Sequence, residues 1–472
     1  MINKTKIVAT IGPSTSSKEM LRKLILRGVN VCRINFSHST HEEAEQIITN
    51  IKEINQDLHV HTAILADLQG PKIRVGEIQP SIKLRKGNKV FFNTRKNSKQ
   101  DIHVNYSNFA KDVRKGDRIL IDDGKIALRV EHTNMLNRVR LTVLFGGVLK
   151  SNKGINLPNT TTSLPGITRK DRRDLEFILN QKVEWIGLSF VRSSKDVYAL
   201  KRLIKKHKKS KALVIAKIEK SEAITEVDNI IEATDAIMVA RGDLGVEVPL
   251  HKVPVHQKMI VQKCIKKSKP VVIATQMLES MTDNLFATRA EVNDVANSVI
   301  DGADAMMLSG ETSVGKHPLR AVDTMRKVIK DVERSKHNIS KNSRQRELEV
   351  NDRYISNAIC ANACQISDAV KVKAIITATD SGYNTIKTSS YRPGAYIYAF
   401  TNNHTILNTL SLVWGVKGFY YTGGRTTDQL VLETKEILKK HKYVRKGDMV
   451  INIASMPAKD KGMTNMMKLS KV

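Results

Sequence analysis

Several features common in secreted and membrane proteins are missing from this chain of 472 residues. No run approaches about eighteen apolar residues, and the first strand-like stretch, residues 6–11, is reached without the apolar region and cleavage site of a signal peptide. The four cysteines are too few and too far apart for a disulfide framework. Cys360 and Cys364 lie one helical turn apart but supply only half of a zinc site. We therefore expect a cytoplasmic protein with buried free thiols and no zinc.

Acidic residues are also scarce. With 78 lysines and arginines against 47 aspartates and glutamates, the formal net charge is +31, which raises the question of a nucleic-acid partner. The lysines gather in helix-like stretches with few aromatic residues to stack on bases, at residues 201–211, 263–269 and 435–446. We interpret these stretches as solvated helix faces, and expect small anionic substrates, no specific nucleic acid and no membrane partner.

Short runs rich in β-branched residues recur through the first two-thirds of the chain. They lie at residues 6–11, 31–36, 62–68, 185–191, 213–218, 236–240, 270–275 and 304–308. Most are followed by helix-like segments, and this alternation is typical of a parallel sheet covered on both faces. Eight such units predict an α/β fold built on a (β/α)8 TIM barrel, with the active site at the C-terminal ends of the strands.

The rhythm is broken once, where about a hundred residues separate the third run from the fourth. The segments in between are short, are separated by Gly and Asn turns, and include no long helix. They predict an inserted small β-barrel at residues 72–165, between the two parts of the catalytic barrel, 1–71 and 166–342. Because the insertion leaves from a strand's C-terminal end, we expect a lid that closes over the site and excludes water.

A third unit follows a polar stretch near residues 335–349. A helix-like segment at 354–367 and strand-like runs at 374–378, 395–400, 417–421 and 448–453 predict a C-terminal α/β regulatory domain over residues 343–472. Its first strand leads into a hydroxyl-rich loop that contains Thr379, Ser381 and Thr385. Backbone N–H groups in such a loop can hold a phosphate. Ordinary helix N-capping is an equally good explanation.

The most informative stretch is the fifth run, where Lys217 and Glu219 stand two residues apart at the strand's end. Side chains at i and i+2 share one face of a strand, so an ammonium and a carboxylate project together. Such a pair can hold a divalent metal with the carboxylate and meet an anionic reacting group with the ammonium. A simple ion pair at the rim is the alternative for this segment alone.

Other strand ends carry polar groups as well. These groups are Arg33, Asn35 and Ser37 after the second run, Asp67 at the third, Asp243 after the sixth and Thr275 at the seventh. Singly, each could be a rim ion pair, a helix cap or a turn. Together they predict an anion-plus-metal site, in which Asp243 shares a divalent ion with Glu219.

Four motifs resemble those of the pyruvate kinase family, at residues 34–38, 214–224, 240–243 and 274–281. The resemblance extends over essentially the whole chain and its order of domains. It implies phosphoryl transfer from phosphoenolpyruvate to ADP, giving pyruvate and ATP, with Mg²⁺ or Mn²⁺ as cofactor. A metal-dependent barrel aldolase or lyase acting on 2-oxo acids is the alternative, although it has little need of a nucleotide-binding lid. A basic nucleic-acid-binding protein without catalysis is a third.

The resemblance also implies roles for individual residues. Lys217 and Arg33 would stabilise the transferring phosphoryl group, while Glu219 and Asp243 would hold the metal. Thr275 and the backbone N–H groups of Gly242 and Asp243 would seat the substrate carboxylate, and Thr275 would help to deliver the proton. The positions matching the family's nucleotide contacts are Asn35, His38, Arg74 and Lys153.

One departure from the family pattern concerns K⁺. Many members have Thr-Lys-Gly-Pro-Glu after the third-strand aspartate, where this chain has Leu-Gln-Gly-Pro-Lys at residues 68–72. This resembles the K⁺-independent branch, in which the ammonium of Lys72 would replace the ion's charge. The monovalent-cation site, vestigial or actual, would comprise Asn35, Ser37, Asp67 and Leu68. A surface lysine at a domain hinge is the alternative.

The resemblance further implies regulation and assembly. Family members often bind a sugar phosphate or nucleotide effector through a Ser/Thr-rich loop in the third domain, which Thr379, Ser381 and Thr385 match. Tyr383 and Asn384 depart from the Arg-Ser or Arg-Thr pair common there. Family members are usually homotetramers, so a homotetramer is expected.

Overall fold

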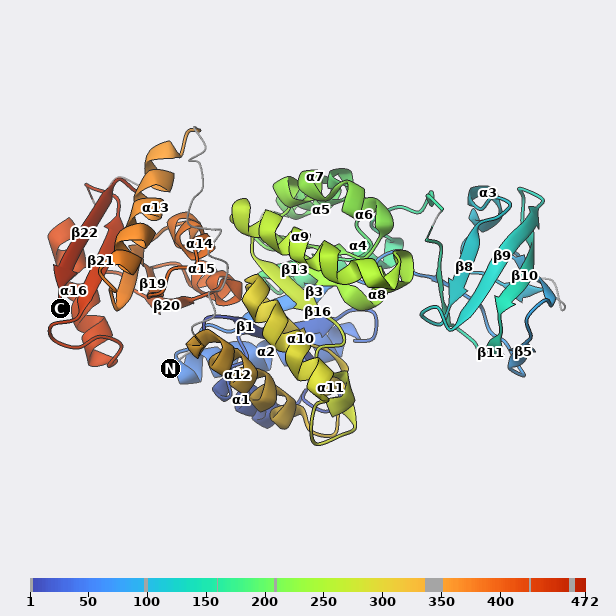
Figure 1. Cartoon of the computed structure of the whole chain (residues 1–472), viewed down its shortest axis with the longest axis horizontal. Helices are drawn as coiled ribbons and strands as arrows, with labels where there is room; N and C mark the ends of the chain where they lie inside the picture. Colours follow the sequence, from blue (N-terminus) through green and yellow to red (C-terminus); the bar gives the residue numbers. More distant parts are fainter. Residues whose placement is uncertain are drawn as a thin grey trace.

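The computed structural model describes residues 3–96, 101–158, 160–207, 210–335, 351–423, 426–457 and 463–472. Three units lie in a row, with a barrel in the middle, an all-β unit at one end and an α/β unit at the other (Figure 1). The expected boundary at 342/343 falls outside the described residues. No helix in these ranges is both long and apolar enough to cross a membrane.

The central unit is a closed barrel of parallel strands in the order β1-β17-β16-β15-β14-β13-β3-β2. The strands are β1 (Lys6–Ile11), β2 (Val31–Asn35), β3 (Ala63–Asp67), β13 (Trp185–Leu188), β14 (Leu213–Ile218), β15 (Ala236–Ala240), β16 (Val271–Ala274) and β17 (Ala305–Leu308). All eight coincide with the expected runs, so the predicted TIM barrel is confirmed.

Helices surround the barrel. The main ones are α1 (Lys18–Leu26), α2 (His41–Leu58), α4 (Arg169–Asn180), α5 (Ser194–Lys206), α7 (Val227–Ala233), α9 (Val253–Lys266), α10 (Arg289–Asp301) and α12 (Pro318–Arg334). Shorter ones are α6 (Ser221–Thr225), α8 (Arg241–Glu247), α11 (Gly310–Ser313), η1 (Leu250–Lys252) and η2 (Glu279–Thr282). Helices α2, α4 and α10 begin with a threonine N-cap and an acidic residue at N3 that bonds back, a capping box that satisfies free N–H groups at the helix start.

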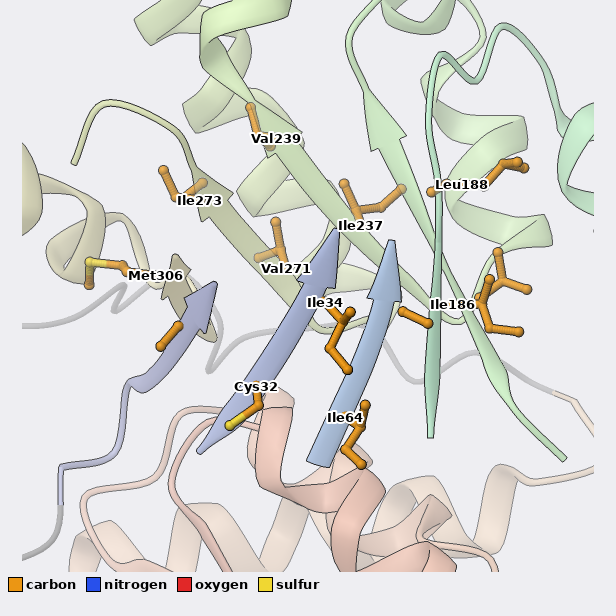
Figure 2. Packing of buried hydrophobic residues seen from close by; sticks show 14 of the residues in the cluster. Cys32, Ile34, Ile64, Ile186, Leu188, Ile237, Val239, Val271, Ile273 and Met306 are labelled. Carbon is orange, nitrogen blue, oxygen red and sulfur yellow. The ribbon is translucent and has the colours of Figure 1, made fainter. Parts of the chain in front are cut away.

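Strand alternation decides which side chains reach the site. On β2, Cys32 and Ile34 pack outward into the core between strands and helices (Figure 2). Val31 lies in the separate core inside the barrel. Because neighbouring side chains on a strand point to opposite faces, Arg33 and Asn35 point to the same side as Val31.

The inserted unit is all-β apart from the short helix α3 (Phe109–Asp112). Its strands are β4 (Ile73–Arg74), β5 (Ile82–Leu84), β6 (Lys89–Asn93), β7 (Ile102–His103), β8 (Arg118–Ile121), β9 (Ile126–Thr133), β10 (Arg138–Phe145), β11 (Gly147–Leu149) and β12 (Gly154–Asn156). Seven of them form one sheet, β4-β12-β8-β9-β10-β6-β7, and β5 pairs with β11. The sheet is curled, and its two edges meet through a single bridge between Val75 and Val104. The expected small β-barrel is thus present, closed by one bridge instead of a full ladder.

The C-terminal unit is a five-stranded sheet in the order β20-β19-β18-β21-β22. Its elements are α13 (Tyr354–Ala369), β18 (Ala374–Ala378), α14 (Tyr383–Ser390), β19 (Tyr396–Thr401), α15 (His404–Thr409), η4 (Leu410–Leu412), β20 (Val416–Tyr420), α16 (Thr427–Lys440), β21 (Met449–Ala454) and β22 (Met466–Lys471). The four expected strands are all present. The fifth, β22, was not predicted and runs antiparallel along β21.

The C-terminal unit is bonded to the barrel at the N-terminal ends of three strands. The Lys6 ammonium donates to the Val416 carbonyl (2.6 Å), and Asn408 donates to Glu184 (2.9 Å), just before β13. Arg392 pairs with Asp304, just before β17, at 2.8 Å, with both side chains buried. We call Lys6, Glu184 and Asp304 the floor anchors. They lie at the opposite end of their strands from the rim, where the polar residues of interest gather.

Candidate active site

Residues from the C-terminal ends of several barrel strands line one cavity of about 370 Å³. Among the residues that line it are Thr10, Arg33, Asn35, His38, Lys217, Glu219, Asp243, Thr275 and Ser309. The barrel therefore gathers in one place the polar residues that the sequence places at the ends of different strands.

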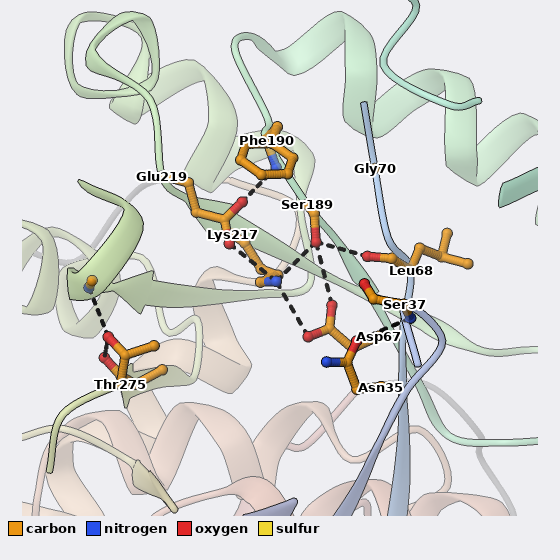
Figure 3. A network of polar contacts seen from close by, with 12 residues as sticks. Asn35, Ser37, Asp67, Leu68, Gly70, Ser189, Phe190, Lys217, Glu219 and Thr275 are labelled. Atoms are coloured by element: carbon orange, nitrogen blue, oxygen red, sulfur yellow. Dashed lines mark hydrogen bonds and ion pairs between the residues drawn. The ribbon is translucent and has the colours of Figure 1, made fainter. Parts of the chain in front are cut away.

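Lys217 lies at the centre of the polar network (Figure 3). Its ammonium is 3.2 Å from Asp67 Oδ2, 3.0 Å from Glu219 Oε1 and 2.8 Å from Ser189 Oγ. Burial by itself would lower the pKa of Lys217, but the two carboxylates outweigh it and raise the pKa above its usual value. The lysine is therefore a fixed cation, and its three N–H groups have three buried acceptors.

Asp67 holds two cations together. The Arg33 guanidinium contacts Asp67 Oδ2 at 2.7 Å through Nε and Nη2, and its Nη1 donates to Thr10 Oγ1 at 2.9 Å. Burial would raise the pKa of Asp67, but Lys217 and Arg33 lower it overall. The result is an ionised carboxylate that orients two positive groups toward the same cavity, an arrangement suited to an anionic ligand.

Glu219 and Asp243 are the carboxylates that could hold a metal. Glu219 Oε2 accepts the Phe190 N–H at 2.7 Å. Burial and then the nearby charge of Asp243 raise the pKa of Glu219, against the lowering effect of Lys217. A divalent cation between the two carboxylates would relieve that repulsion. In the described ranges no group of three or more His, Cys, Asp and Glu side chains is close enough to hold a metal. The two carboxylates of Glu219 and Asp243 alone fit Mg²⁺ or Mn²⁺, because these ions accept one or two carboxylates and take their other ligands from substrate and water.

Thr275 has a strained backbone, with φ at 69°. A β-branched residue in this left-handed region is rare and costs about 1–3 kcal/mol, so other contacts must hold it there. Its hydroxyl accepts the Gly242 N–H at 2.7 Å, and Arg241 Nη2 donates to its carbonyl at 2.8 Å. Strain of this kind collects at functional sites, and here it keeps the hydroxyl beside the N–H groups expected to bind a carboxylate.

The four nucleotide candidates are divided between two units. Asn35 and His38 line the barrel cavity. Arg74 and Lys153 lie on the inserted unit, where Arg74 donates to the Asn152 carbonyl (2.9 Å) and Lys153 pairs with Asp122 (2.8 Å). Burial, then Arg74 and Lys72, lower the pKa of His38, so both cations lie near enough to act on it.

The four residues proposed as monovalent-cation ligands lie together (Figure 3). Asn35 Oδ1 accepts the Ser37 N–H at 3.1 Å, and the Leu68 carbonyl accepts the Ser189 hydroxyl at 2.7 Å. Gly70, with φ at 70°, lies so close to Ser189 that a side chain there would collide with it. The Lys72 ammonium has no carboxylate within 4.0 Å in the described part of the chain, although 25 ion pairs form elsewhere within it.

The hydroxyl-rich loop of the C-terminal unit lines a second cavity of about 740 Å³. Thr379 and Ser381 face this cavity, and the hydroxyl of Thr379 already accepts the Gly382 N–H at 2.9 Å. Thr385 is fully buried, and its hydroxyl bonds to Thr377 at 2.7 Å. The loop therefore caps its own helix and also borders a space large enough for a small ligand.

Sequence reasoning missed two polar groups that contact the central cluster. Ser189 directly follows β13 and bonds both Lys217 and the Leu68 carbonyl, and Thr10 on β1 bonds Arg33. A serine at a strand's end resembles an ordinary turn residue. Its position at a rim that already carried other candidates was the signal that could have identified it.

Comparison with known proteins agrees with this geometry. The family models "Pyruvate kinase, barrel domain" and "Pyruvate kinase, alpha/beta domain" match residues 2–322 and 357–470. The chain is 40% identical to the pyruvate kinase of Geobacillus stearothermophilus and 41% identical to that of Staphylococcus saprophyticus, in each case over 99% of its length and 80% of the relative's. It is also similar to the crystal structure of a pyruvate kinase from Cryptosporidium parvum, with a TM-score of 0.91, 34% identity and coverage of 99% and 96% of the two chains.

Proposed function

This chain belongs to the pyruvate kinase family and transfers the phosphoryl group of phosphoenolpyruvate to ADP. We propose how its residues divide that work. The observation that carries the proposal is the buried cluster in which Asp67 orients Arg33 and Lys217 toward one cavity. The family assignment leaves the aldolase and nucleic-acid-binding alternatives without support.

Lys217 and Arg33 are proposed as the catalytic cations. The phosphoryl group carries its charge on peripheral oxygens as it is transferred, and buried fixed cations stabilise that charge without reorganising. To bind it, the Lys217 ammonium exchanges one of its present acceptors, most simply Ser189, for a phosphoryl oxygen. When bound to Glu219 and Asp243, Mg²⁺ or Mn²⁺ supplies further stabilisation of negative charge on substrate oxygens.

The strained turn at Thr275 is proposed as the carboxylate seat. The N–H groups of Gly242 and Asp243 and the Thr275 hydroxyl would bind the carboxylate of phosphoenolpyruvate. To do so, the Gly242 N–H exchanges the Thr275 hydroxyl, and the Thr275 O–H exchanges the Ala274 carbonyl (2.6 Å), for a carboxylate oxygen. The Thr275 hydroxyl is also polar and fixed, so it can help to pass the proton that converts the enolate to pyruvate, directly or through water.

The inserted unit is proposed to act as the lid. Arg74 and Lys153 are its cations for the ADP phosphates, and Asn35 and His38 are their counterparts on the barrel. To bind a phosphate, Lys153 must give up its ion pair with the Asp122 carboxylate and pair with the phosphate instead. Closure would bring the two sets together and keep water from the transferring group.

Independence of K⁺ is proposed from Lys72. Its ammonium has no carboxylate partner in the described ranges, and its charge is one of those that lower the pKa of His38, a nucleotide candidate. An internal ammonium near the nucleotide candidates would supply the charge of a monovalent ion bound at Asn35, Ser37, Asp67 and Leu68 and make that ion unnecessary.

Regulation is proposed at the cavity of the C-terminal unit. Its hydroxyl-rich loop, with Thr379 and Ser381, suits a phosphate, and aromatic Tyr383 and Tyr421 line the same space. We propose a sugar phosphate or nucleotide as effector, and leave Thr385 out of the contact set because it is buried. Isothermal titration with ribose 5-phosphate, AMP and fructose 1,6-bisphosphate tests this, and no binding by any of them would contradict it.

Assembly as a homotetramer in the cytoplasm is also proposed. The barrel surface leaves large apolar side chains exposed, including Leu250 at 74% and Phe286 at 70%, as expected of a surface that a second copy covers. The four cysteines are free and buried, as expected in a reducing compartment. Sedimentation equilibrium tests the assembly, and a monomer at micromolar concentration would contradict it.

The first experiment is a coupled assay of pyruvate formation from phosphoenolpyruvate and ADP with Mg²⁺, with and without K⁺. We expect comparable activity under both conditions. Activity only with K⁺ would leave the kinase assignment intact and refute the role of Lys72.

A further inference from the structure

A buried ion pair lies where the lid joins the barrel, outside the set of residues assigned above. Lys220 Nζ is 2.7 Å from Glu247 Oε2, and the side chains are 11% and 1% exposed. The other oxygen of the same carboxylate, Oε1, accepts the side-chain N–H of Asn156 at 3.0 Å. Asn156 is the last residue of β12, the strand on which the lid returns to the barrel. One carboxylate therefore contacts both lid and barrel.

The ion pair also joins the two elements that carry the metal carboxylates. Lys220 directly follows Glu219 at the end of β14. Glu247 is the last residue of α8, a helix of seven residues whose first turn carries Asp243. Strands β14 and β15, which precede these two elements, are hydrogen-bonded neighbours. The pair thus fixes how far apart the two segments after those strands can lie.

A small cavity of about 40 Å³ borders this contact and brings further site elements to it. Phe190, whose N–H binds Glu219, lines the cavity together with Lys72, Asn156, Lys220 and Glu247. The returning strand of the lid, the Lys72 side chain and the residue whose N–H holds Glu219 therefore lie around one cavity beside the buried Glu247 carboxylate.

We propose that Glu247 is a positioning residue that couples the lid to the spacing of Glu219 and Asp243, through Asn156 on one side and Lys220 on the other. The proposal rests on the metal role of Glu219 and Asp243 given above. Because Glu247 does not line the barrel cavity, it acts only through the segments it joins.

Glu247 couples the lid to the barrel because its two carboxylate oxygens bond one residue of each. A carboxylate as buried as Glu247 cannot lose a partner to water, so removing either contact leaves a buried charge or donor unsatisfied. A change in lid position moves Asn156, and the carboxylate must follow to keep both contacts. By linkage, a metal that fixes Glu219 and Asp243 must then also bias the position of the lid, and to the same degree.

The test measures the lid while only the metal is bound. Wild-type protein is titrated with Mn²⁺ alone, without nucleotide or phosphoenolpyruvate, and Mn²⁺ affinity is followed by electron paramagnetic resonance. Amide hydrogen exchange is measured in parallel over residues 153–157 of the lid. We expect Mn²⁺ to slow exchange there by at least about threefold, the size of a modest coupling.

Asn156→Ala cuts the lid contact and keeps the ion pair. It should leave Mn²⁺ affinity within about twofold of wild type while abolishing the Mn²⁺-dependent slowing in residues 153–157. The control is Asn137→Ala, because in the described part of the chain the Asn137 side chain bonds only to Asn93 and Asn134 of the lid. This variant should keep the slowing. Persistent slowing in Asn156→Ala would overturn the proposal.

Glu247→Gln removes the charge and should weaken Mn²⁺ binding about tenfold, which a merely structural role would not do. If the unpaired lysine prevents folding, the double variant Lys220→Met/Glu247→Gln carries no buried charge and replaces it. Mn²⁺ affinity unchanged in the folded variant, with only a lower melting temperature, would overturn the proposal. If wild-type protein itself neither binds Mn²⁺ at Glu219 and Asp243 nor has kinase activity, it is the proposed metal site that fails.

Discussion

Replacing Lys217 with methionine tests the central claim about the chemistry. Methionine has nearly the length of lysine without the charge, so it fills the same space at the end of β14. We expect kcat to fall by at least about 10²-fold with saturating substrates and Mg²⁺, because a preorganised charged group is lost from a water-poor site.

The magnitude follows from the surroundings of the ammonium. Lys217 is only 8% exposed, and all three of its acceptors are buried, so little water can replace it. Loss of one such electrostatic group costs about 2.7–4 kcal/mol of transition-state stabilisation, or about 10²–10³ in kcat. The fold should survive, because Asp67 still forms its ion pair with Arg33 and Glu219 still accepts the hydrogen bond from the Phe190 N–H.

The assay is coupled pyruvate formation, with thermal unfolding measured on the same samples. Lys201→Met is the matched control, since Lys201 also pairs with an aspartate, Asp235 at 2.7 Å, but on a helix outside the barrel. The control should keep kcat within about twofold. A near-normal kcat in Lys217→Met, or an equal loss in the control, would refute the reasoning.

Three further expectations concern other parts of the molecule. Lys72→Glu should lower activity without K⁺ at least about tenfold, because the internal positive charge is lost, and added K⁺ should restore the activity of the variant. Equal rates of the variant with and without K⁺ would contradict this. Arg392→Met should reduce the free energy of unfolding in urea by about 3–5 kcal/mol, since it leaves the buried Asp304 without its cation, and a loss below about 1 kcal/mol would show that the pair is dispensable. Burial, then His404 and Lys417, lower the pKa of His61 from 6.5 to about 4. The unfolded chain therefore binds one more proton than the folded one between these values, and stability should fall as pH drops from about 6.5 to about 4. His61→Asn should show a flatter dependence in the same urea series, and a curve parallel to wild type would count against the assignment.

The barrel was predictable because its strands are buried on both faces. Such strands appear as continuous apolar runs with sharp ends, and all eight were identified on that basis. The last strand, β22, was missed because it is an edge strand. Its sequence, MMKLSK, has no buried residue and no apolar run, so only its pairing with β21 defines it.

The site was predictable residue by residue but not contact by contact. Strand ends identified Arg33, Lys217 and Glu219, whereas the contact between Lys217 and Asp67 joins positions 150 residues apart and depends on closure of the barrel. Ser189 was missed for the same reason. The role of its hydroxyl depends on contact with the Lys217 ammonium, which comes from a different strand.

The lid shows a different limit. Turn residues and short strands predicted a small β unit, but the partners of its cations, such as Asp122 for Lys153, come from loop conformations with positive φ that no apolar pattern encodes. Residues 122 and 123 both adopt such φ values, at 53° and 56°.

The floor anchors have a mechanical consequence. The strands they hold contain six residues in β1 and four each in β13 and β17, or about 13–20 Å of backbone at about 3.3 Å per residue. An extended chain cannot lengthen, and its hydrogen-bonded neighbours keep it from bowing, so an axial displacement at the anchored end arrives at the rim nearly undiminished. A misplacement of about 1 Å in a catalytic group can change a rate about 10²-fold. If the C-terminal unit binds an effector as proposed, a movement of about 1 Å there would therefore be enough to change turnover, although that unit lies on the far side of the barrel from the chemistry.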